Sequence, residues 1–489
     1  MTLPFLVDPV RIRDLLLRSS AAALAALLAA GCATFDKPLP AEPKVTVSTL
    51  GATDTAVAWP RDDWWQRYGD PQLDQLVTEG LAGSPTLAAA RARIARAEAA
   101  AGVARAALLP QVSGNGAANY QKYSENYIFP PPLGGSWQTD VRATLDFSFE
   151  FDFWNKNGAA LSAALSQAQG AAADAEAARL ALTTGIARAY YNLQRLFAQR
   201  EVSRAAITQR EDIVRITNER FSAGLDTKVE VRQAEAALAT VRTELAQYDD
   251  AIVVARNQIA ALTGAGPARG ESIAAVRMSA GPVTALPASI PLDLVSRRPE
   301  ITASRWRVDA STHDIEVAKA QFYPNINIAA FAGLSSLGLS NFLLSSSGIF
   351  GVGPAIHLPI FEGGRLNANL HGREADANLA IATYNEVVID AVHELADAVS
   401  SIRGLARTAA EQAQARTATT DAYNIAVIRY RAGLGNYLTV LTAQTAQLAQ
   451  DRLNVDLEAR AFDLDVNLAR ALGGGYVDKS FGALSEASH

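Results

Sequence analysis

Apolar and polar residues alternate without interruption from Asp140 to Phe153. The apolar positions fall at every second residue: Val141, Ala143, Leu145, Phe147, Phe149, Phe151 and Phe153. Because successive side chains of a strand point to opposite faces, this pattern predicts a strand over 139–153 with one apolar face. Aromatic residues on one face and charges on the other are typical of a strand in a membrane β-barrel. The residues expected to face lipid are Val141, Leu145, Phe147, Phe149 and Phe151. A soluble amphipathic sheet is the alternative.

Three further segments are expected to be strands. Segment 348–361 alternates in the same way but more weakly, and 111–121 and 324–334 are candidate partner strands. Four strands cannot close a barrel, for which about eight is the practical minimum. An open sheet edge is not tolerated in lipid, so at least two copies of the chain must share one barrel.

Two long alanine-rich stretches, 158–220 and 365–430, contain no proline. Each predicts a helix about 95 Å long, at about 1.5 Å per residue. Such a length indicates a coiled coil or a tube of helices. The segments 226–263 and 436–472 are the expected return helices. In the first of them, apolar residues recur every seven positions from Val231 to Ile259, which is the seam of a coiled coil.

The two halves of the chain repeat each other. The interval between Pro85 and Pro110 is the same as that between Pro299 and Pro324, and the motif Phe-Ser-Ala-Gly-Leu at 221–225 is matched by Tyr-Arg-Ala-Gly-Leu at 430–434. Each half therefore reads helix, strand, loop, strand, long helix, tight turn, helix. The repeats span 85–263 and 299–472, and the segments 32–84, 264–298 and 473–489 are expected to form a belt around the helices.

The N-terminus carries a signal for export. Three arginines precede an apolar stretch at 21–30, which is too short to span a bilayer, so residues 1–31 are interpreted as a signal peptide. Small residues then lead to Cys32, the only cysteine of the chain. This segment resembles a bacterial lipobox, which implies that Cys32 carries lipid. Ala33 follows it, and by the same resemblance favours the outer membrane. An ordinary secretory signal is the alternative.

Charge and composition exclude other classes of protein. Removing the signal takes away three arginines and two aspartates, which moves the formal net charge from −6 to −7. Nucleic-acid binding needs a basic face, so none is expected. Beyond the signal no apolar run is long enough for a transmembrane helix.

No enzyme motif, cofactor site or metal site is predicted. His393-Glu394 begins like a zinc-protease motif, but Asp397 stands where the second histidine is required. The five histidines are scattered, and no cysteine is left to complete a zinc site.

Several short motifs, in this order and spacing, resemble the TolC-like outer membrane factors, in particular their NodT-type lipoprotein branch. They are Trp64-Trp65, Asp70-Pro71-Gln72-Leu73, Ser84-Pro85-Thr86-Leu87, 150–154 (Glu-Phe-Asp-Phe-Trp), 297–301 (Arg-Arg-Pro-Glu-Ile), Phe322-Tyr323-Pro324, 359–364 (Pro-Ile-Phe-Glu-Gly-Gly), 430–433 and Asn436-Tyr437-Leu438. The resemblance implies a mixed α and β membrane protein: a homotrimeric channel-tunnel in which four strands per protomer form a twelve-stranded β-barrel above a periplasmic α-helical coiled-coil barrel.

The resemblance also implies a function. The chain would be the outer-membrane exit duct of a tripartite RND-type efflux pump for drugs or other small toxic compounds. Its partners would be a periplasmic membrane fusion (adaptor) protein, an inner-membrane RND transporter and outer-membrane lipid. The alternatives are the outer-membrane component of a type I protein secretion system and a non-channel coiled-coil lipoprotein.

The two glycine turns are the expected periplasmic tips. By resemblance they dock the adaptor and close the pore, through Arg220, Phe221, Gly224, Leu225, Arg429, Gly433 and Leu434. Many relatives carry an acidic ring after the second tip, but this chain has Thr439 and Thr442 there. The gate candidates are therefore Tyr430, Tyr437, Leu438, Thr439 and Thr442.

Overall fold

The chain divides into two units, one holding a β-sheet and the other built mainly from helices. The computed structural model describes residues 35–51, 58–126, 128–276, 289, 291 and 293–478. Unit 1 comprises Met1–Pro43, Ala95–Gly170 and Arg305–Thr383, and unit 2 comprises Lys44–Ile94, Ala171–Ser304 and Tyr384–His489. The predicted signal peptide and Cys32 lie outside the described residues.

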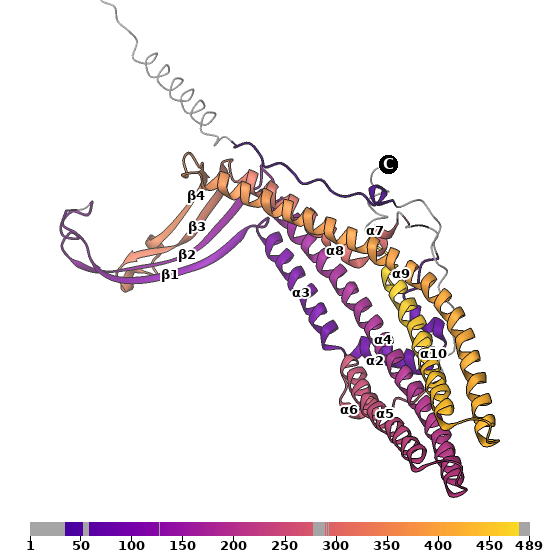
Figure 1. Cartoon of the computed structure of the whole chain (residues 1–489). Helices are drawn as coiled ribbons and strands as arrows, with labels where there is room; N and C mark the ends of the chain where they lie inside the picture. Colours follow the sequence, from indigo (N-terminus) through magenta and orange to yellow (C-terminus); the bar gives the residue numbers. More distant parts are fainter. Residues whose placement is uncertain are drawn as a thin grey trace, which may run out of the picture. The chain divides into compact units, whose positions relative to one another are not determined.

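Both halves of the chain contribute the same series of elements (Figure 1). The first half forms α3 (Pro85–Ala106), β1 (Gln111–Lys122), β2 (Trp137–Phe151), α4 (Lys156–Ser222) and α5 (Lys228–Leu262). The second half forms α8 (Pro299–Ala320), β3 (Asn325–Leu337), β4 (Gly348–His357), α9 (Arg365–Arg431) and α10 (Tyr437–Ala471). The long helices α4 and α9 both have 67 residues, and the return helices α5 and α10 both have 35. The internal repeat is therefore matched in length as well as in order.

Shorter elements lie between these. They are the helices α2 (Pro71–Gly83), α6 (Pro267–Glu271) and α7 (Leu294–Arg297) and the 3-10 helices η1 (Val47–Leu50), η2 (Trp64–Tyr68), η3 (Leu339–Asn341) and η4 (Ser345–Ser347). Within the described residues, no helix is both long and apolar enough to cross a membrane.

The sheet of unit 1 is antiparallel, in the order β1-β2-β3-β4. Its register brings apolar residues of all four strands onto one face, since Phe147 lies opposite both Val112 and Ala330, and Ala330 lies opposite Val352. On the other face, Asp146 accepts hydrogen bonds of 2.8 Å from Asn115 and Thr144. The alternation in the sequence thus becomes an apolar and a polar face of one sheet.

Two strands end earlier than the sequence pattern predicts. β2 covers 137–151 and not 139–153, because the Asp152 side chain accepts hydrogen bonds from the backbone N–H groups of Asn157 (3.0 Å) and Gly158 (2.7 Å) at the start of α4. β4 ends at His357 and not at 361, and Pro359, which has no backbone N–H, follows shortly after. In both places the requirements of the next helix or of proline override the alternation.

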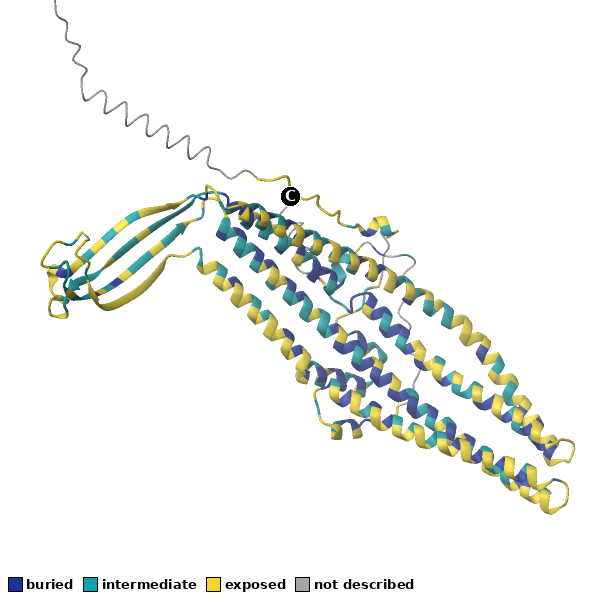
Figure 2. Ribbon diagram, turned by 60° about the vertical axis from the view of Figure 1, so that its left-hand side comes forward, coloured by how far each residue is buried: buried dark blue, intermediate teal, exposed yellow. Residues whose placement is uncertain are grey.

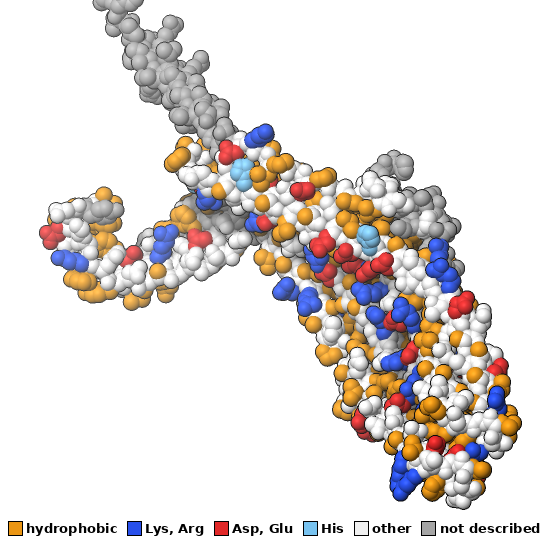
Figure 3. Space-filling view, in the orientation of Figure 1, with side chains coloured by type: hydrophobic (Ala, Val, Ile, Leu, Met, Phe, Trp, Pro, Cys, Tyr) orange, Lys and Arg blue, Asp and Glu red, His pale blue; other side chains and the backbone are white. Residues whose placement is uncertain are grey.

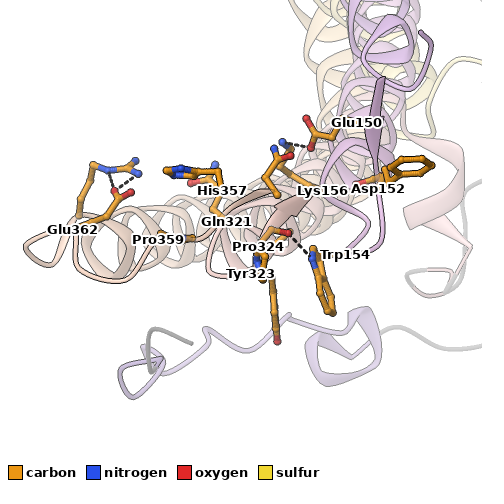
Figure 4. A pocket seen from close by; sticks show the side chains of 14 residues that line it. Glu150, Asp152, Trp154, Lys156, Gln321, Tyr323, Pro324, His357, Pro359 and Glu362 are labelled. Carbon is orange, nitrogen blue, oxygen red and sulfur yellow. Dashed lines mark hydrogen bonds and ion pairs between the residues drawn. The ribbon is translucent and has the colours of Figure 1, made fainter. Parts of the chain in front are cut away.

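Aromatic side chains gather at both ends of β2. Near its start, the ring of Trp137 stacks on that of Tyr120 with 5.2 Å between centroids. Beyond its end, the Trp154 ring stacks on Tyr323 at 4.6 Å, and its indole N–H donates to the carbonyl of Pro324 at 2.8 Å (Figure 4). Trp154, Tyr323 and Pro324 line a cavity of about 250 Å³. In the same lining Lys156 pairs with Glu150, and Arg365 pairs with Glu362 (Figure 4). The cations that line it are therefore already neutralised.

An extended strap, residues 35–43, runs along α9 in unit 1. Its Phe35 ring packs on Phe322 at 4.5 Å between centroids. Side chains of α9 then accept hydrogen bonds from its backbone N–H groups: Asp36 to Asn367 (3.4 Å), Leu39 to Glu374 (3.0 Å) and Glu42 to Asn378 (3.0 Å). Three backbone donors of a strap without a sheet partner are thus satisfied by side chains of a helix.

The core of unit 2 joins the belt segment to the long helices. Trp64 and Trp65 are buried, and the Tyr191 ring stacks on Phe462 of α10 at 4.2 Å. Asp70 caps α2 by accepting from the backbone N–H of Gln72 at 2.9 Å, and it also accepts from the Tyr190 hydroxyl at 2.6 Å. The belt segment therefore packs against the long helices through two of the sequence motifs, Trp64-Trp65 and 70–73.

Most of the heptad seam of α5 is buried in unit 2 (Figure 2). Its buried members include Val231, Ala234, Leu238, Val241, Ile252, Ala255 and Ile259. This burial is what the period of seven predicts for a helix that packs as a coiled coil.

Candidate gate at the helical tips

Both tips of unit 2 are turns closed by a glycine of positive φ. Gly224 (φ +71°) follows α4, and Gly433 (φ +76°) follows α9. After each glycine the next backbone N–H bonds back into the helix: Leu225 to the carbonyl of Arg220 (2.9 Å) and Leu434 to that of Arg429 (2.8 Å). This is the left-handed helix end that glycine allows. The sequence motif shared by the two halves is thus a shared turn.

The return helices begin with different caps. Thr227 caps α5 in a capping box with Glu230. Asn436 caps α10 by accepting from the backbone N–H of Thr439 at 3.0 Å. Both caps fix where the chain re-enters a helix.

One cluster of polar side chains joins the two tips. Arg220 donates to the two carboxylate oxygens of Asp226 at 2.9 and 3.2 Å, and a third donor, its Nη1, bonds the backbone carbonyl of Tyr430 at 3.0 Å. The Tyr430 hydroxyl donates a short hydrogen bond to Asp226 and lies 3.3 Å from the Thr217 hydroxyl. The Arg220 guanidinium also covers the Tyr430 ring, 4.5 Å from its centroid. We call these four residues the tip latch.

The electrostatics of the tip latch favour a charged Asp226 and a neutral Tyr430. Burial alone would raise the pKa of Asp226, but the hydrogen bonds from Arg220 and Tyr430 hold it below its usual value. Burial, together with the bond to Asp226, raises the pKa of Tyr430 to about 12. At neutral pH the Tyr430 hydroxyl therefore keeps the proton that it donates to Asp226.

An apolar cluster lies beneath the latch. Residues of α4, α5, α9 and α10 contribute to it: Ile213, Ile216, Ala234, Tyr423, Ala426, Tyr430, Tyr437 and Val440. Tyr430 and Tyr437 are 0% and 2% exposed, and their rings lie 6.4 Å apart. These two predicted gate residues are therefore part of the packing between helices within the chain.

The other predicted gate residues lie on the surface of α10. Leu438 is 61% exposed, and Thr439 and Thr442 are exposed beside it. The Thr442 hydroxyl donates to the carbonyl of Leu438 at 2.9 Å, and the Thr439 hydroxyl donates to Asn436 at 2.8 Å. Of the five predicted gate residues, these three are therefore the ones with exposed side chains.

The predicted docking residues, like the predicted gate residues, include both exposed side chains and side chains held within the chain. Phe221, Leu225 and Leu434 are large apolar side chains that the tips leave exposed, by 44%, 64% and 70%. Arg429 is exposed too, whereas Arg220 is held within the latch. Figure 3 shows hydrophobic and basic side chains together at the ends of the helices. Exposed apolar side chains on a protruding turn form a surface suited to protein contact.

The residues predicted to face lipid lie on the apolar face of the sheet. Leu145 and Phe151 are exposed, by 63% and 40%, Phe147 and Phe149 are half-buried, and Val141 is buried. Across the sheet the same face exposes Val112 on β1 and Phe350, Val352 and Ile356 on β4. Sequence reasoning did not include the residues of β4 among the lipid-facing positions, although its alternation could have identified them.

Asp226 and Thr217 belong to the tip latch but are not among the site residues predicted from the sequence. Asp226 follows the Phe-Ser-Ala-Gly-Leu motif directly, which was the available signal. Its partner Tyr430 is 204 positions away, so no local spacing connects them. In the part of the chain that the structure describes, no group of three or more His, Cys, Asp or Glu side chains is arranged to hold a metal ion.

Comparison with known proteins identifies the family. The family model described as outer membrane efflux protein matches residues 76–265 and 291–474. Among relatives, the fusaric acid resistance protein FusA of Burkholderia cepacia is 38% identical over 358 residues, covering 71% of this chain and 68% of the relative. The multidrug resistance outer membrane protein MdtP of Shigella flexneri is 31% identical over 461 residues, covering 92% and 94%.

Solved structures agree with these relatives. The outer membrane protein VceC of Vibrio cholerae has a TM-score of 0.79 at 39% identity, covering 85% of this chain and 100% of that one. The outer-membrane channel OprN has a TM-score of 0.79 at 26% identity, covering 91% and 99%. The arrangement of long helices and a four-stranded sheet is thus an architecture found in outer-membrane channels, and the chain belongs to the outer membrane efflux protein family, whose members are transport conduits and not enzymes.

Proposed function

We propose that three copies of this chain form one outer-membrane exit duct, with their sheets joined edge to edge into a twelve-stranded barrel and their helices forming a periplasmic tunnel. The observation that carries this proposal is the sheet of unit 1. Its register gives it one apolar face, and in the described structure β1 and β4 each have a partner strand on one side alone. In lipid such edges must be paired. The whole length of β1 is exposed, as an edge that awaits a partner would be (Figure 2).

Cysteine crosslinking between the edge strands tests this assembly. In a Cys32→Ser background, Asn115→Cys on β1 is combined in turn with Ile349→Cys, Gly351→Cys, Gly353→Cys and Ala355→Cys on β4, which lie on the same face of the sheet. We expect at least one pair to link chains into a closed trimer in the membrane, with dimer and trimer bands after oxidation.

The matched control is the pair Arg142→Cys and Ser335→Cys. These residues face each other on β2 and β3 within one chain, so their disulfide leaves a monomer band. Edge pairs that give monomer bands alone, in membranes where the control pair reacts, would contradict the shared barrel.

We propose that the tips are the closed, partner-binding end of the duct. The tip latch ties α4 to the end of α9, which supports a role in holding the pore shut. The exposed side chains of Phe221, Leu225 and Leu434 support docking of a periplasmic membrane fusion (adaptor) protein by apolar contact. The inner-membrane partner would be an RND transporter. The gate itself would consist of Leu438, Thr439 and Thr442, positioned by the buried Tyr430 and Tyr437.

The cargo is proposed to be drugs or other small toxic compounds. This rests on the relatives, which are named for resistance to fusaric acid and to multiple drugs. A strain that lacks the chain should become more sensitive to such compounds, and a plasmid copy should restore resistance. Unchanged sensitivity, with defective release of a secreted protein, would favour the type I secretion alternative.

Lipid attachment at Cys32 is a further part of the proposal. Cys32→Ser should abolish labelling by a fatty-acid analogue while leaving the assembled trimer in the membrane, because the barrel itself inserts. Labelling that persists in the variant would rule out Cys32 as the attachment site.

A further inference from the structure

A cavity of about 410 Å³ lies between α4 and α10 in unit 2. Two ion pairs in its lining join the helices: Arg188 Nε lies 2.7 Å from Asp463, and Arg195 Nη1 lies 3.0 Å from Asp456. The pairs repeat at the same interval on both helices, since 195 follows 188 by as many positions as 463 follows 456. Exposed ion pairs of this kind contribute little to stability, so the packing of the helices does not depend on them.

The cavity is on the side of α4 and α10 that faces away from the belt segment. On the belt side, the Tyr190 hydroxyl of α4 donates to Asp70 at 2.6 Å, and Asp465 of α10 accepts a hydrogen bond of 2.7 Å from the belt. Arg188 and Asp463 each stand two positions before these contact residues. Two positions are a rotation of about 200° around a helix, which places the cavity and the belt on opposite sides of the helix pair.

This orientation gives the cavity a place in the proposed duct. If the belt surrounds the tunnel, the side of α4 and α10 that faces away from it lines the interior. The inference that follows rests on the proposed function in this respect. Three copies of the chain would present the same side chains as a ring inside one tunnel.

Arg460 gives the cavity a positive charge that its lining does not offset. The lining contains three arginines, Arg188, Arg195 and Arg460, and two aspartates, each of which pairs with one of the first two arginines. Arg460 is exposed, and in the described part of the chain it forms no ion pair and no hydrogen bond. Arg188 uses its Nε atom for Asp463, and its two Nη atoms make no hydrogen bond within the described structure. Guanidinium donors are therefore left over for a ligand.

Apolar side chains line the same cavity beside these donors. Leu453 is 40% exposed, Leu457 is half-buried, and the ring of Tyr191 also contributes to the lining. An inorganic anion would match the guanidinium groups but leave the leucines in contact with water. A molecule with an acidic group and an apolar body would match both parts of the lining, and the volume is within the usual range for small-molecule sites.

We propose that this cavity is a cargo contact site inside the tunnel and that it takes small organic anions. The acidic group of the cargo lies against Arg460, and its apolar body lies against Leu453 and Leu457. The site is open and its arginine is exposed, so binding is weak. Weak binding suits a duct, because cargo must enter the site and also leave it.

Single-channel recording at neutral pH tests the site with a matched pair of probes. Cinnamate, an aromatic carboxylate, should block the chloride current of the unmodified trimer, whereas the neutral cinnamamide at the same concentration should not. Arg460→Gln removes no contact within the described chain, so the variant should assemble, and half-block should then need about ten times more cinnamate. Arg407→Gln is the control, because it removes an exposed, unpaired arginine of α9 outside the cavity.

The outcomes separate this site from the duct itself. Equal block by cinnamate of the unmodified trimer and of Arg460→Gln would overturn the site and leave the duct standing. Equal block by cinnamate and cinnamamide would overturn its preference for anions. A trimer that forms no channel in the bilayer would overturn the proposed duct, and the cargo site with it.

Diffraction locates the ligand without any variant. Crystals of the unmodified trimer soaked in para-bromocinnamate should show an anomalous bromine peak beside Leu453 and Leu457, with the carboxylate toward Arg460. Bromine peaks elsewhere only, or a carboxylate of a neighbouring copy paired with Arg460, would overturn the proposal.

Discussion

Arg220 Nη1 donates a hydrogen bond of 3.0 Å to the backbone carbonyl of Tyr430, a residue 210 positions later in the chain. The two glycine turns are therefore joined within one protomer. The bond uses a backbone acceptor, so the link from Arg220 persists whatever side chain stands at 430. The Tyr430 hydroxyl adds a second, separable link through Asp226. Opening of the tip by moving one turn away from the other would break both links.

Removal of the Tyr430 hydroxyl should loosen the tip. Tyr430→Phe keeps the buried ring but loses the bond to the Asp226 carboxylate, and hydrogen bonds to charged groups contribute about 1.5–3 kcal/mol. We expect larger or more frequent single-channel openings from an intact trimer, and Tyr430→Ala should have a greater effect. Tyr437→Phe is the control, since Tyr437 packs in the same cluster and makes no hydrogen bond to Asp226 in the described structure. Equal effects of Tyr430→Phe and Tyr437→Phe on channel opening would contradict a role for the hydrogen bond between Tyr430 and Asp226.

Acid should weaken the same latch. The pKa of Asp226 is lowered in the tip latch, so the contribution of Asp226 to the latch is complete above the usual aspartate pKa of about 4 and is lost as the pH falls through the lowered value. Channel conductance recorded from about pH 6 to about pH 3 should therefore rise at the acidic end of this range. Asp226→Asn should conduct more at neutral pH and lose the acid response, whereas Glu219→Gln, at an exposed acid of α4, should retain it. An acid response that survives in Asp226→Asn would show that another group titrates.

Substitution of the glycine in either turn should leave the trimer assembled but weaken its binding to the adaptor protein. Gly433 has a φ of +76°, and a Cβ there would meet nothing nearer than Arg220 Nη1 at 4.0 Å. Aspartate visits this left-handed conformation more readily than most residues, and a substitution at such a glycine costs at least about 0.4–1 kcal/mol. Gly433→Asp and Gly224→Asp should thus give heat-resistant trimers that crosslink poorly to the adaptor. Gly404→Asp, at a helical glycine of α9 with open space around it, is the control. Failed assembly with normal adaptor binding would mean that the turns are structural hinges.

The two faces of β2 should respond differently to charge. Phe147 lies on the apolar face opposite Val112 and Ala330, and Ser148 lies on the polar face opposite Gln111 and Ala329. Phe147→Arg should reduce the yield of heat-resistant trimer, since a charge at the bilayer midplane costs about 2–4 kcal/mol. Ser148→Arg should be much milder. Equal damage from both variants would contradict the assignment of the faces.

Local patterns predicted the elements of this fold because each pattern is contained in one segment. The alternation from Asp140, the proline-free helices and the heptads from Val231 need no knowledge of the rest of the chain. The errors lie where an element meets its neighbour. Asp152 keeps the alternation of β2 in the sequence but is used to cap α4, and this is visible in the hydrogen bonds alone.

The position of the tips could be predicted from the sequence, but the side chains that contact each other there could not. The repeated Gly-Leu motif located both turns, yet Tyr430 and Asp226 meet through tertiary packing across 204 residues. The same packing buries Tyr430 and Tyr437, so an aromatic residue beside a tip is not by itself a side chain in the pore. The sequence shows which residues share one side of a helix. It does not show which neighbouring helix packs over that side, because this depends on the tertiary fold.

The equal length of α4 and α9, each of 67 residues, limits how the chain can change in evolution. One inserted residue would advance a helix by about 1.5 Å and turn everything beyond it by about 100°. An insertion in α4 alone would carry Arg220 away from Tyr430 and shift the seam against the neighbouring helices. Tolerated changes in length should therefore come in multiples of seven residues and in both halves together. A duplicated chain of this kind must lengthen or shorten α4 and α9 together.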